Sequence, residues 1–140
     1  MRKLLSTALI VAALATAFIN LSSCEKDKGT LPNIAFKTGT GYTSTDVTKM
    51  AGDSVLIGII ASKSEGEDVL KTLNISASVN GGTAATVTNG QITIPTAQED
   101  NFAGEYKFPA LTVSGNIKYI FTVTNRDGLT NAVSLTVTTM

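Results

Sequence analysis

Apolar residues recur at every second position near the end of this chain, and this period constrains the fold more than any other feature. Ile117, Tyr119, Phe121 and Val123 share one parity, and the same spacing returns after residue 132. Successive side chains of a strand point to opposite faces, so each apolar set is expected to face a core and the polar set to face solvent. The pattern predicts a closing hairpin over residues 117–138.

Turn-forming residues divide the chain after residue 32 into short strands, without a helical stripe. Asn125-Arg126-Asp127-Gly128 supplies the last turn, Asn80-Gly81-Gly82 an earlier one, and Asn89-Gly90 a two-residue hairpin. The predicted strands are Asn33–Thr38, Thr45–Met50, Ser54–Ser62, Lys71–Val79, Thr83–Thr88, Gln91–Pro95, Gly104–Val113, Ile117–Thr124 and Ala132–Thr138. Nine short strands favour an all-β, antiparallel sandwich over a barrel.

Two strands carry further positional information. Residues 54–62 are apolar on both parities in places, which predicts a central strand covered on both sides. Leu73, Ile75, Ala77 and Val79 alternate with polar residues, which predicts a half-buried strand with these four facing the core.

The composition excludes several function classes. Eleven basic residues balance eleven acidic ones, and His and Trp are absent. Arg2 and Lys3 lie in the leader described below, so the remainder is slightly acidic, which argues against a nucleic-acid partner. Cys24 is the one cysteine, so no disulfide forms within the chain. We expect stability to come from core packing alone.

The first 23 residues have the layout of a signal peptide. Arg2 and Lys3 precede an uncharged, largely apolar run over residues 4–19, shorter than a usual membrane span. Leu21-Ser22-Ser23-Cys24 follows and resembles the bacterial lipobox, which implies diacylglycerol on the Cys24 thiol and cleavage before it. The alternatives are an uncleaved anchor or an ordinary free or buried cysteine.

Three segments follow from this interpretation: a signal peptide over 1–23, a lipidated cysteine and tether over 24–32, and one domain over 33–140. Attached acyl chains would hold the protein on a membrane. Glu25-Lys26-Asp27-Lys28 resembles the segments that follow the cysteine in surface lipoproteins of Bacteroidota. The expected location is the outer membrane, with the choice between its outer surface and its periplasmic face left open.

The domain carries a resemblance of its own. Ala51-Gly52-Asp53-Ser54-Val55, the loop around residues 65–68, and Tyr119–Gly128 resemble the Ig-like domains of small Bacteroidota lipoproteins. The closing Y-x-F-T-V-T-x-x-D-G pattern is also similar to PKD-type and cadherin-type repeats, without the cadherin calcium motif. The resemblance implies a fold and no activity. Tyr119 either forms a tyrosine corner, with its hydroxyl bonded to nearby backbone, or simply fills the core.

Candidate chemical sites are few. Without histidine the usual triads and zinc sites are excluded, and we expect no enzyme, cofactor or metal centre. Two acidic clusters, Glu65/Glu67/Asp68 and Glu99/Asp100, are either solvated loops or calcium ligands. Asp53-Ser54-Val55 resembles the acceptor pattern for O-glycosylation in exported Bacteroidota proteins, which makes Ser54 a candidate modification site; the alternative is a turn before a buried strand.

Three hypotheses for function follow. The first is a membrane-anchored, non-catalytic module of the cell envelope that presents its sandwich to a protein or glycan through loop tips or a strand edge. The second is a glycan-binding accessory of a polysaccharide-uptake system, with Tyr42, Phe102, Tyr106 and Phe108 available for stacking. The third is a structural subunit of an envelope complex.

Overall fold

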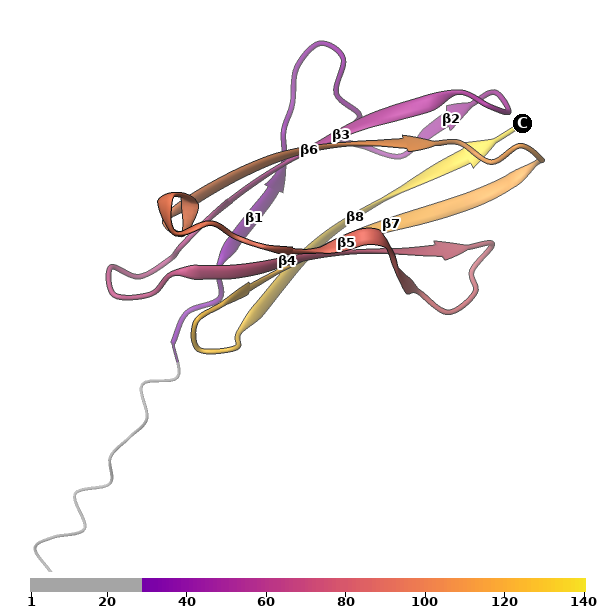
Figure 1. The fold of residues 1–140 in the computed structure, drawn as a ribbon. Coiled ribbons are helices and arrows are strands. Elements are labelled where there is room, and N and C mark those ends of the chain that lie inside the picture. Colours follow the sequence, from indigo (N-terminus) through magenta and orange to yellow (C-terminus); the bar gives the residue numbers. More distant parts are fainter. Residues whose placement is uncertain (1–28) are drawn as a thin grey trace, which may run out of the picture.

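The computed structural model describes residues 29–140, which form a two-layer sandwich of β-strands (Figure 1). Its elements are β1 (Asn33–Phe36), β2 (Val47–Lys49), β3 (Ser54–Ser62), β4 (Leu70–Val79), β5 (Ala85–Thr93), a single 3₁₀ turn η2 (Thr96–Gln98), β6 (Asn101–Pro109), β7 (Gly115–Asn125) and β8 (Thr130–Thr139). The expected all-β class is confirmed.

The strand order identifies the sandwich as Ig-like. One sheet has the order β1-β3-β6 and the other the order β2-β8-β7-β4-β5. All pairs are antiparallel except β2 with β8. With the first strand divided between the sheets, these are the A-B-E and G-F-C sets of an immunoglobulin domain, with β5 added beside β4 and the fourth strand of the A-B-E sheet absent.

The core lies between the sheets, where the alternating residues of both meet. The predicted hairpin of β7 and β8 is confirmed, with Tyr119 opposite Leu135 and Phe121 opposite Val133. Phe121 is fully buried and contacts rings from the smaller sheet, with centroid separations of 6.0 Å to Phe36 and 6.2 Å to Phe108. The aromatic contacts therefore join β7 to both outer strands of the opposite sheet.

The strand β3 is central in its sheet and begins and ends at the expected residues. Its odd-numbered residues Val55, Ile57 and Ile59 are almost completely buried against the second sheet. The expectation that both faces are covered is only partly right: Gly58 is buried on the outer face, but Ile60 is exposed there.

The predicted hairpin at Asn89-Gly90 is wrong. Residues 85–93 form one strand, with Gln91 paired to Asn74 and Thr86 paired to Ser76, so four residues of β5 oppose Ile75 alone. Asn89 takes a positive φ of 57° inside this bulge. The signal for a turn was therefore correct locally, but the chain continues in the same direction along β4.

Two further expectations need correction. The sixth strand begins at Asn101 and ends at Pro109, so the segment predicted as Gly104–Val113 lies three to four residues too late. Proline cannot donate to the ladder, and residues 110–114 turn the chain toward the other sheet. On β4, Val79 is 48% exposed, because it lies at the strand end beside the Asn80-Gly81 turn.

Other turn predictions hold. Asn80 and Gly81 both have positive φ, 48° and 73°, and the Gly82 N–H donates to the Val79 carbonyl over 2.9 Å. Gly128 has a φ of 81° in the turn between β7 and β8. Each residue type supplies the left-handed backbone that its turn needs.

Tyr119 combines the two roles considered for it. Its ring stacks on Phe108 with centroids 4.4 Å apart, and its hydroxyl donates to the carbonyl of Pro109 over 3.3 Å. Burial raises the pKa of this phenol. The hydroxyl thus reaches backbone ten residues upstream, as in a tyrosine corner, and ties the end of β6 to the other sheet.

The segment before β1 is held at one end of the sandwich. Asn131 Nδ2 donates to the carbonyl of Pro32 over 2.9 Å, and Ser64 Oγ donates to that of Leu31 over 2.5 Å. The side chain of Asn125 donates both to Asp68 and to the carbonyl of Thr30, over 2.5 and 3.4 Å. The incoming chain is therefore fixed to the β3–β4 and β7–β8 connections.

Candidate functional site

The outer face of the smaller sheet carries an exposed apolar row. On β1, β3 and β6 the outward positions come into register so that Ile60 lies between Ala35 and Ala103. Ile60 is 46% exposed, and both alanines are exposed. A branched aliphatic side chain in the middle of a sheet face, flanked by small residues, is a surface that a partner can cover.

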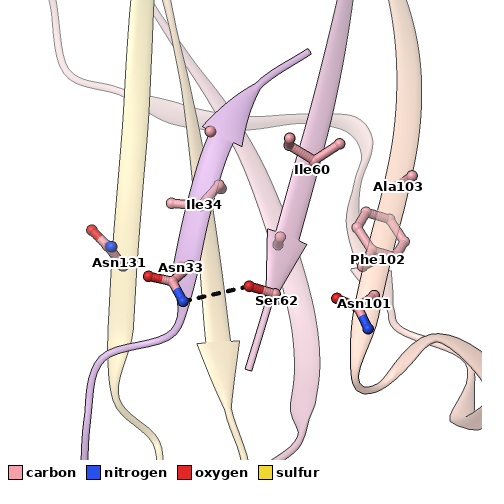
Figure 2. A pocket seen from close by; sticks show the side chains of 10 residues that line it. Asn33, Ile34, Ile60, Ser62, Asn101, Phe102, Ala103 and Asn131 are labelled. Atoms are coloured by element: carbon pink, nitrogen blue, oxygen red, sulfur yellow. Dashed lines mark hydrogen bonds between the residues drawn. The ribbon is translucent and has the colours of Figure 1, made fainter. Parts of the chain in front are cut away.

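A polar row borders this apolar row toward the end of the sheet that receives the incoming chain. Asn33, Ser62 and Asn101 face one another across the three strands, and Asn33 Nδ2 donates to Ser62 Oγ over 3.4 Å (Figure 2). Asn131 of β8 lies beyond β1. The two rows, with adjacent core residues, line a hollow of about 590 Å³, which we call the sheet groove; its lining is Asn33, Ile34, Ala35, Ile60, Ala61, Ser62, Asn101, Phe102, Ala103 and Asn131.

A charged row borders the apolar row on the other side. Lys37 Nζ lies 2.6 Å from Glu105 Oε1, and the Tyr42 hydroxyl donates to the same oxygen over 2.5 Å. The Lys37 ammonium also lies 4.5 Å from the centroid of the Tyr42 ring. Gly58 lies beneath this group, and a Cβ atom there would come within 2.7 Å of Lys37 Cβ. The absence of a side chain at Gly58 lets Lys37 and Tyr42 lie across the sheet.

Electrostatics in this row follow from the shared oxygen. Hydrogen bonds from Lys37 and then Tyr42 lower the pKa of Glu105 below its ordinary value. The carboxylate of Glu105, which accepts from Lys37, raises the pKa of that ammonium, and the neighbouring Tyr42 adds to the rise. Both charges face solvent, so they shape the border of the groove and add little to stability.

The sequence-predicted site residues are not brought together. Cys24 lies outside the described residues, so its lipidation stays a prediction. Ser54 is exposed at the start of β3 and pairs with Pro109. It occupies an outward position at the opposite end of the strand from Ser62, and its glycosylation also stays a prediction.

Carboxylates of both acidic clusters have protein partners of their own. Asp68 is buried, where it bonds to Asn125 and to the backbone N–H of Val69. Glu99 pairs with Lys71 at 2.6 Å and Asp100 with Lys63 at 2.8 Å. Over residues 29–140, no three acidic, His or Cys side chains form a group suited to a metal ion.

Three of the four aromatic residues considered for sugar stacking face the core instead. Phe102 is buried, Tyr106 lies 6.0 Å from the Phe121 ring, and Phe108 stacks on Tyr119. Phe102 was placed before the strand predicted as Gly104–Val113, whereas it lies inside β6. Tyr42 alone lies on the outer surface, over Gly58. One ring engaged by a lysine is a poor platform for a sugar.

The sheet groove was missed at the sequence level. Ile60 was the one available signal, since it places an apolar residue on the parity that also carries Ser54 and Ser62. The buried pair of Asp68 and Asn125 was also missed, because an acidic loop and a turn asparagine both look solvated in sequence. Their contact depends on the β3–β4 and β7–β8 connections lying at the same end.

Known proteins resemble this chain only distantly. No protein-family model and no curated protein matches the sequence. Among solved structures, similar chains include a superoxide reductase (neelaredoxin) from Ignicoccus hospitalis, with 10% identity, TM-score 0.48 and coverage of 84% of this chain and 86% of that one. The PapD-like domain 7 of human CEP192 has 12% identity, TM-score 0.45 and coverage of 80% and 85%. Murine CRIg has 10% identity, TM-score 0.40 and coverage of 79% and 97%.

These likenesses bring no ligand or activity to this chain, because the identities are 10–12% and the TM-scores lie below 0.5. Within the described part of the chain, no helix is long and apolar enough to cross a membrane.

Proposed function

We propose that this chain is a lipoprotein of the cell envelope, lipidated at Cys24, whose Ig-like domain binds another protein through the sheet groove without catalysing a reaction. The exposed row of Ala35, Ile60 and Ala103, bordered by amides and hydroxyls, carries the proposal. Interface centres combine such an apolar middle with a polar rim. The lipobox-like segment before Cys24 supports the anchored location.

We also propose that the chain is a small lipoprotein of the Bacteroidota kind with a PKD-like or cadherin-like domain. The match of Tyr119–Gly128 to PKD-type and cadherin-type repeats, and the charged residues after Cys24, support a small lipoprotein of the Bacteroidota kind. Placement on the outer membrane follows from that assignment.

Affinity capture from intact membranes tests the groove. We expect a defined partner to be recovered with the wild-type chain and lost with Ile60→Lys, which places a charge in the apolar row. Ser134→Lys is the matched control, because Ser134 is exposed on β8 of the other sheet. Equal recovery with all three chains would refute the groove as the binding surface.

Mass spectrometry of the mature N-terminus tests the anchor. We expect a chain that begins at Cys24 and carries acyl mass, and a Cys24→Ala chain without that mass. A wild-type chain that begins unmodified at Met1 would contradict the lipoprotein assignment and leave the groove proposal standing.

A further inference from the structure

The outer edge of β6 is long, regular and open. Among residues 29–140, the nine residues Asn101–Pro109 pair with β3 without a bulge, and no strand pairs with their other edge. The other edges differ: β2 has three residues, β1 has four, and β5 is bulged. An open regular edge presents a row of backbone donors and acceptors to any strand beside it.

The register of β6 with β3 shows which backbone N–H and C=O groups of β6 point away from β3, toward the open edge. Lys63 N–H donates to the carbonyl of Asp100 over 3.1 Å, and Ala110 N–H donates to that of Asp53 over 2.7 Å. Hydrogen-bonded pairs alternate along an antiparallel ladder, so even-numbered residues of β6 bond to β3. The N–H and C=O groups of Ala103, Glu105 and Lys107 therefore point away from β3, and none has a partner in the described chain.

The second sheet extends beneath this edge. Rings on β6 lie over β7, since Phe108 stacks on Tyr119 and Tyr106 contacts Phe121. At the other side, β1 lies beside β8. Because β4 and then β5 follow β7 in the wider sheet, both continue past β6. The space beside β6, facing β4 and β5, is where an immunoglobulin domain has the fourth strand that the A-B-E sheet lacks here.

Apolar side chains along this opening are only partly buried. Tyr106 and Phe108 of β6 and Val87 and Ile92 of β5 pack against the core but keep part of their surface exposed. A strand beside β6 would cover them with every second side chain, and its other side chains would lie next to Glu105 and Lys107 on the outer face.

We propose that β6 accepts an extended segment of another protein as an added antiparallel strand. That segment has apolar residues at alternate positions, a basic residue facing Glu105 and an acidic residue facing Lys107. Opposite charges in facing positions favour such pairs, and like charges disfavour them. A complete second copy fits less well, because its own β4 and β5 would extend into the space that β4 and β5 already occupy.

This inference deepens the proposed interaction role and rests on it, but it uses the strand edge and not the sheet groove. A strand that adds at β6 supplies affinity through the backbone and specificity through its alternate side chains. Variants in the groove and variants on the edge therefore separate the two proposals.

The test uses the full chain in detergent micelles and the synthetic peptide Ser-Val-Glu-Val-Lys-Val-Thr. Paired antiparallel, its Glu faces Lys107 and its Lys faces Glu105. We expect saturable binding in NMR titrations, with shift changes and slowed amide exchange at Ala103, Glu105 and Lys107. The scrambled peptide Val-Ser-Lys-Val-Val-Glu-Thr is expected to bind at least about tenfold more weakly.

Variants of Lys107 test whether binding uses the backbone of β6. Lys107→Pro removes an outward N–H that β3 does not use, so it is expected to keep the fold and weaken binding by about tenfold or more. Lys107→Thr keeps the N–H and should weaken binding far less. If Lys107→Pro unfolds, Lys107→Glu replaces it, with recovery expected from a peptide carrying Lys at the facing position.

Several outcomes would overturn the proposal. They are equal binding of the scrambled peptide, shift changes confined to the sheet groove, unchanged binding by a folded Lys107→Pro chain, and no saturable binding at millimolar peptide. Self-association through β6 in the absence of peptide would identify a second copy as the occupant and would also refute it.

Discussion

The two sheets of this sandwich end in edges of opposite character. The strand β5 closes the wider sheet with a bulge in which four residues oppose Ile75, whereas β6 closes the smaller sheet with an unbroken ladder. Bulges twist an edge away from potential partners, and regular edges invite them. The comparison indicates that irregularity protects one edge while the other stays available for pairing.

Charge adds to this contrast. On the outer face, β6 carries Glu105 and Lys107. These two charges disfavour pairing with a strand that places like charges opposite them and favour a strand that places opposite charges there. The β5 bulge instead requires a residue without a side chain, since a Cβ on Gly90 would lie 2.4 Å from the Ile75 carbonyl oxygen. One edge is therefore defined by backbone shape and the other by side-chain charge.

The largest expected difference lies in amide exchange along β6. At low protein concentration and without peptide, the N–H groups of Gly104 and Tyr106 should exchange about a thousandfold more slowly than those of Ala103, Glu105 and Lys107. The first pair bonds to β3, and the others face solvent. Exchange measured by NMR checks this, and uniform protection along β6 would contradict an open edge.

Substitution in the bulge should have the next largest effect. Gly90→Ala forces the Ile75 carbonyl or Val87 to move, and we expect a loss of about 3 kcal/mol in the free energy of unfolding. Urea unfolding followed by circular dichroism gives the value. Gly66→Ala is the control, because a Cβ there meets no atom within 4 Å. Equal stabilities of the two variants would show that β5 does not need its bulge geometry.

Removal of the Tyr119 hydroxyl should have a smaller effect on the end of β6. Tyr119→Phe loses the hydrogen bond to the Pro109 carbonyl and is expected to cost about 1 kcal/mol in unfolding free energy. Tyr106→Phe is the matched control, since its hydroxyl has no hydrogen-bond partner among residues 29–140. A larger loss from Tyr106→Phe would mean that the anchor of β6 was assigned to the wrong tyrosine.

The smallest expected effect is a pH dependence from the charged row. The pKa of Glu105 is lowered in the fold, so its contribution is fully present above the ordinary value of about 4.5 and is lost as pH falls through the folded value. The pKa of Lys37 is raised, so its contribution is present below about 10.5 and is lost above its folded value.

Glu105→Gln isolates the acid limb of that dependence. The small stability difference between wild type and variant should be constant near neutral pH and should shrink below pH about 4. Melting temperatures across that range measure it. The alkaline limb is less informative, since burial also raises the pKa values of Tyr106 and Tyr119. A difference that grows in acid would reverse the assigned sign.

Much of the fold could be predicted from side-chain period alone. The bounds of β3 and the pairing of β7 with β8 follow from alternation and turn residues, because these strands bury side chains at alternate positions. Asn89-Gly90 misled the prediction, since a two-residue turn and a bulge both use a left-handed residue. Local sequence does not say whether the chain then reverses or continues.

The candidate surface was less predictable for a different reason. Ile60 appears in the sequence as part of a strand covered on both sides, and only the three-dimensional arrangement shows that its side chain is exposed on the outer face of the sheet. The open edge of β6 depends on strand order, which alternation does not encode. A strand pattern reports what is buried within one chain, and binding surfaces depend on what is left uncovered.

The attachment of Thr30, Leu31 and Pro32 to one end of the sandwich limits how the domain can be oriented on a membrane. If Cys24 is anchored, the six residue steps from there to Thr30 span at most about 20 Å. The membrane would then lie close to Asn125 and Asn131, whose side chains bind the carbonyls of Thr30 and Pro32. This short connecting segment would keep the β3–β4 and β7–β8 connections close to the bilayer. A partner would then approach from the side, along the strands, where the sheet groove and the β6 edge both lie.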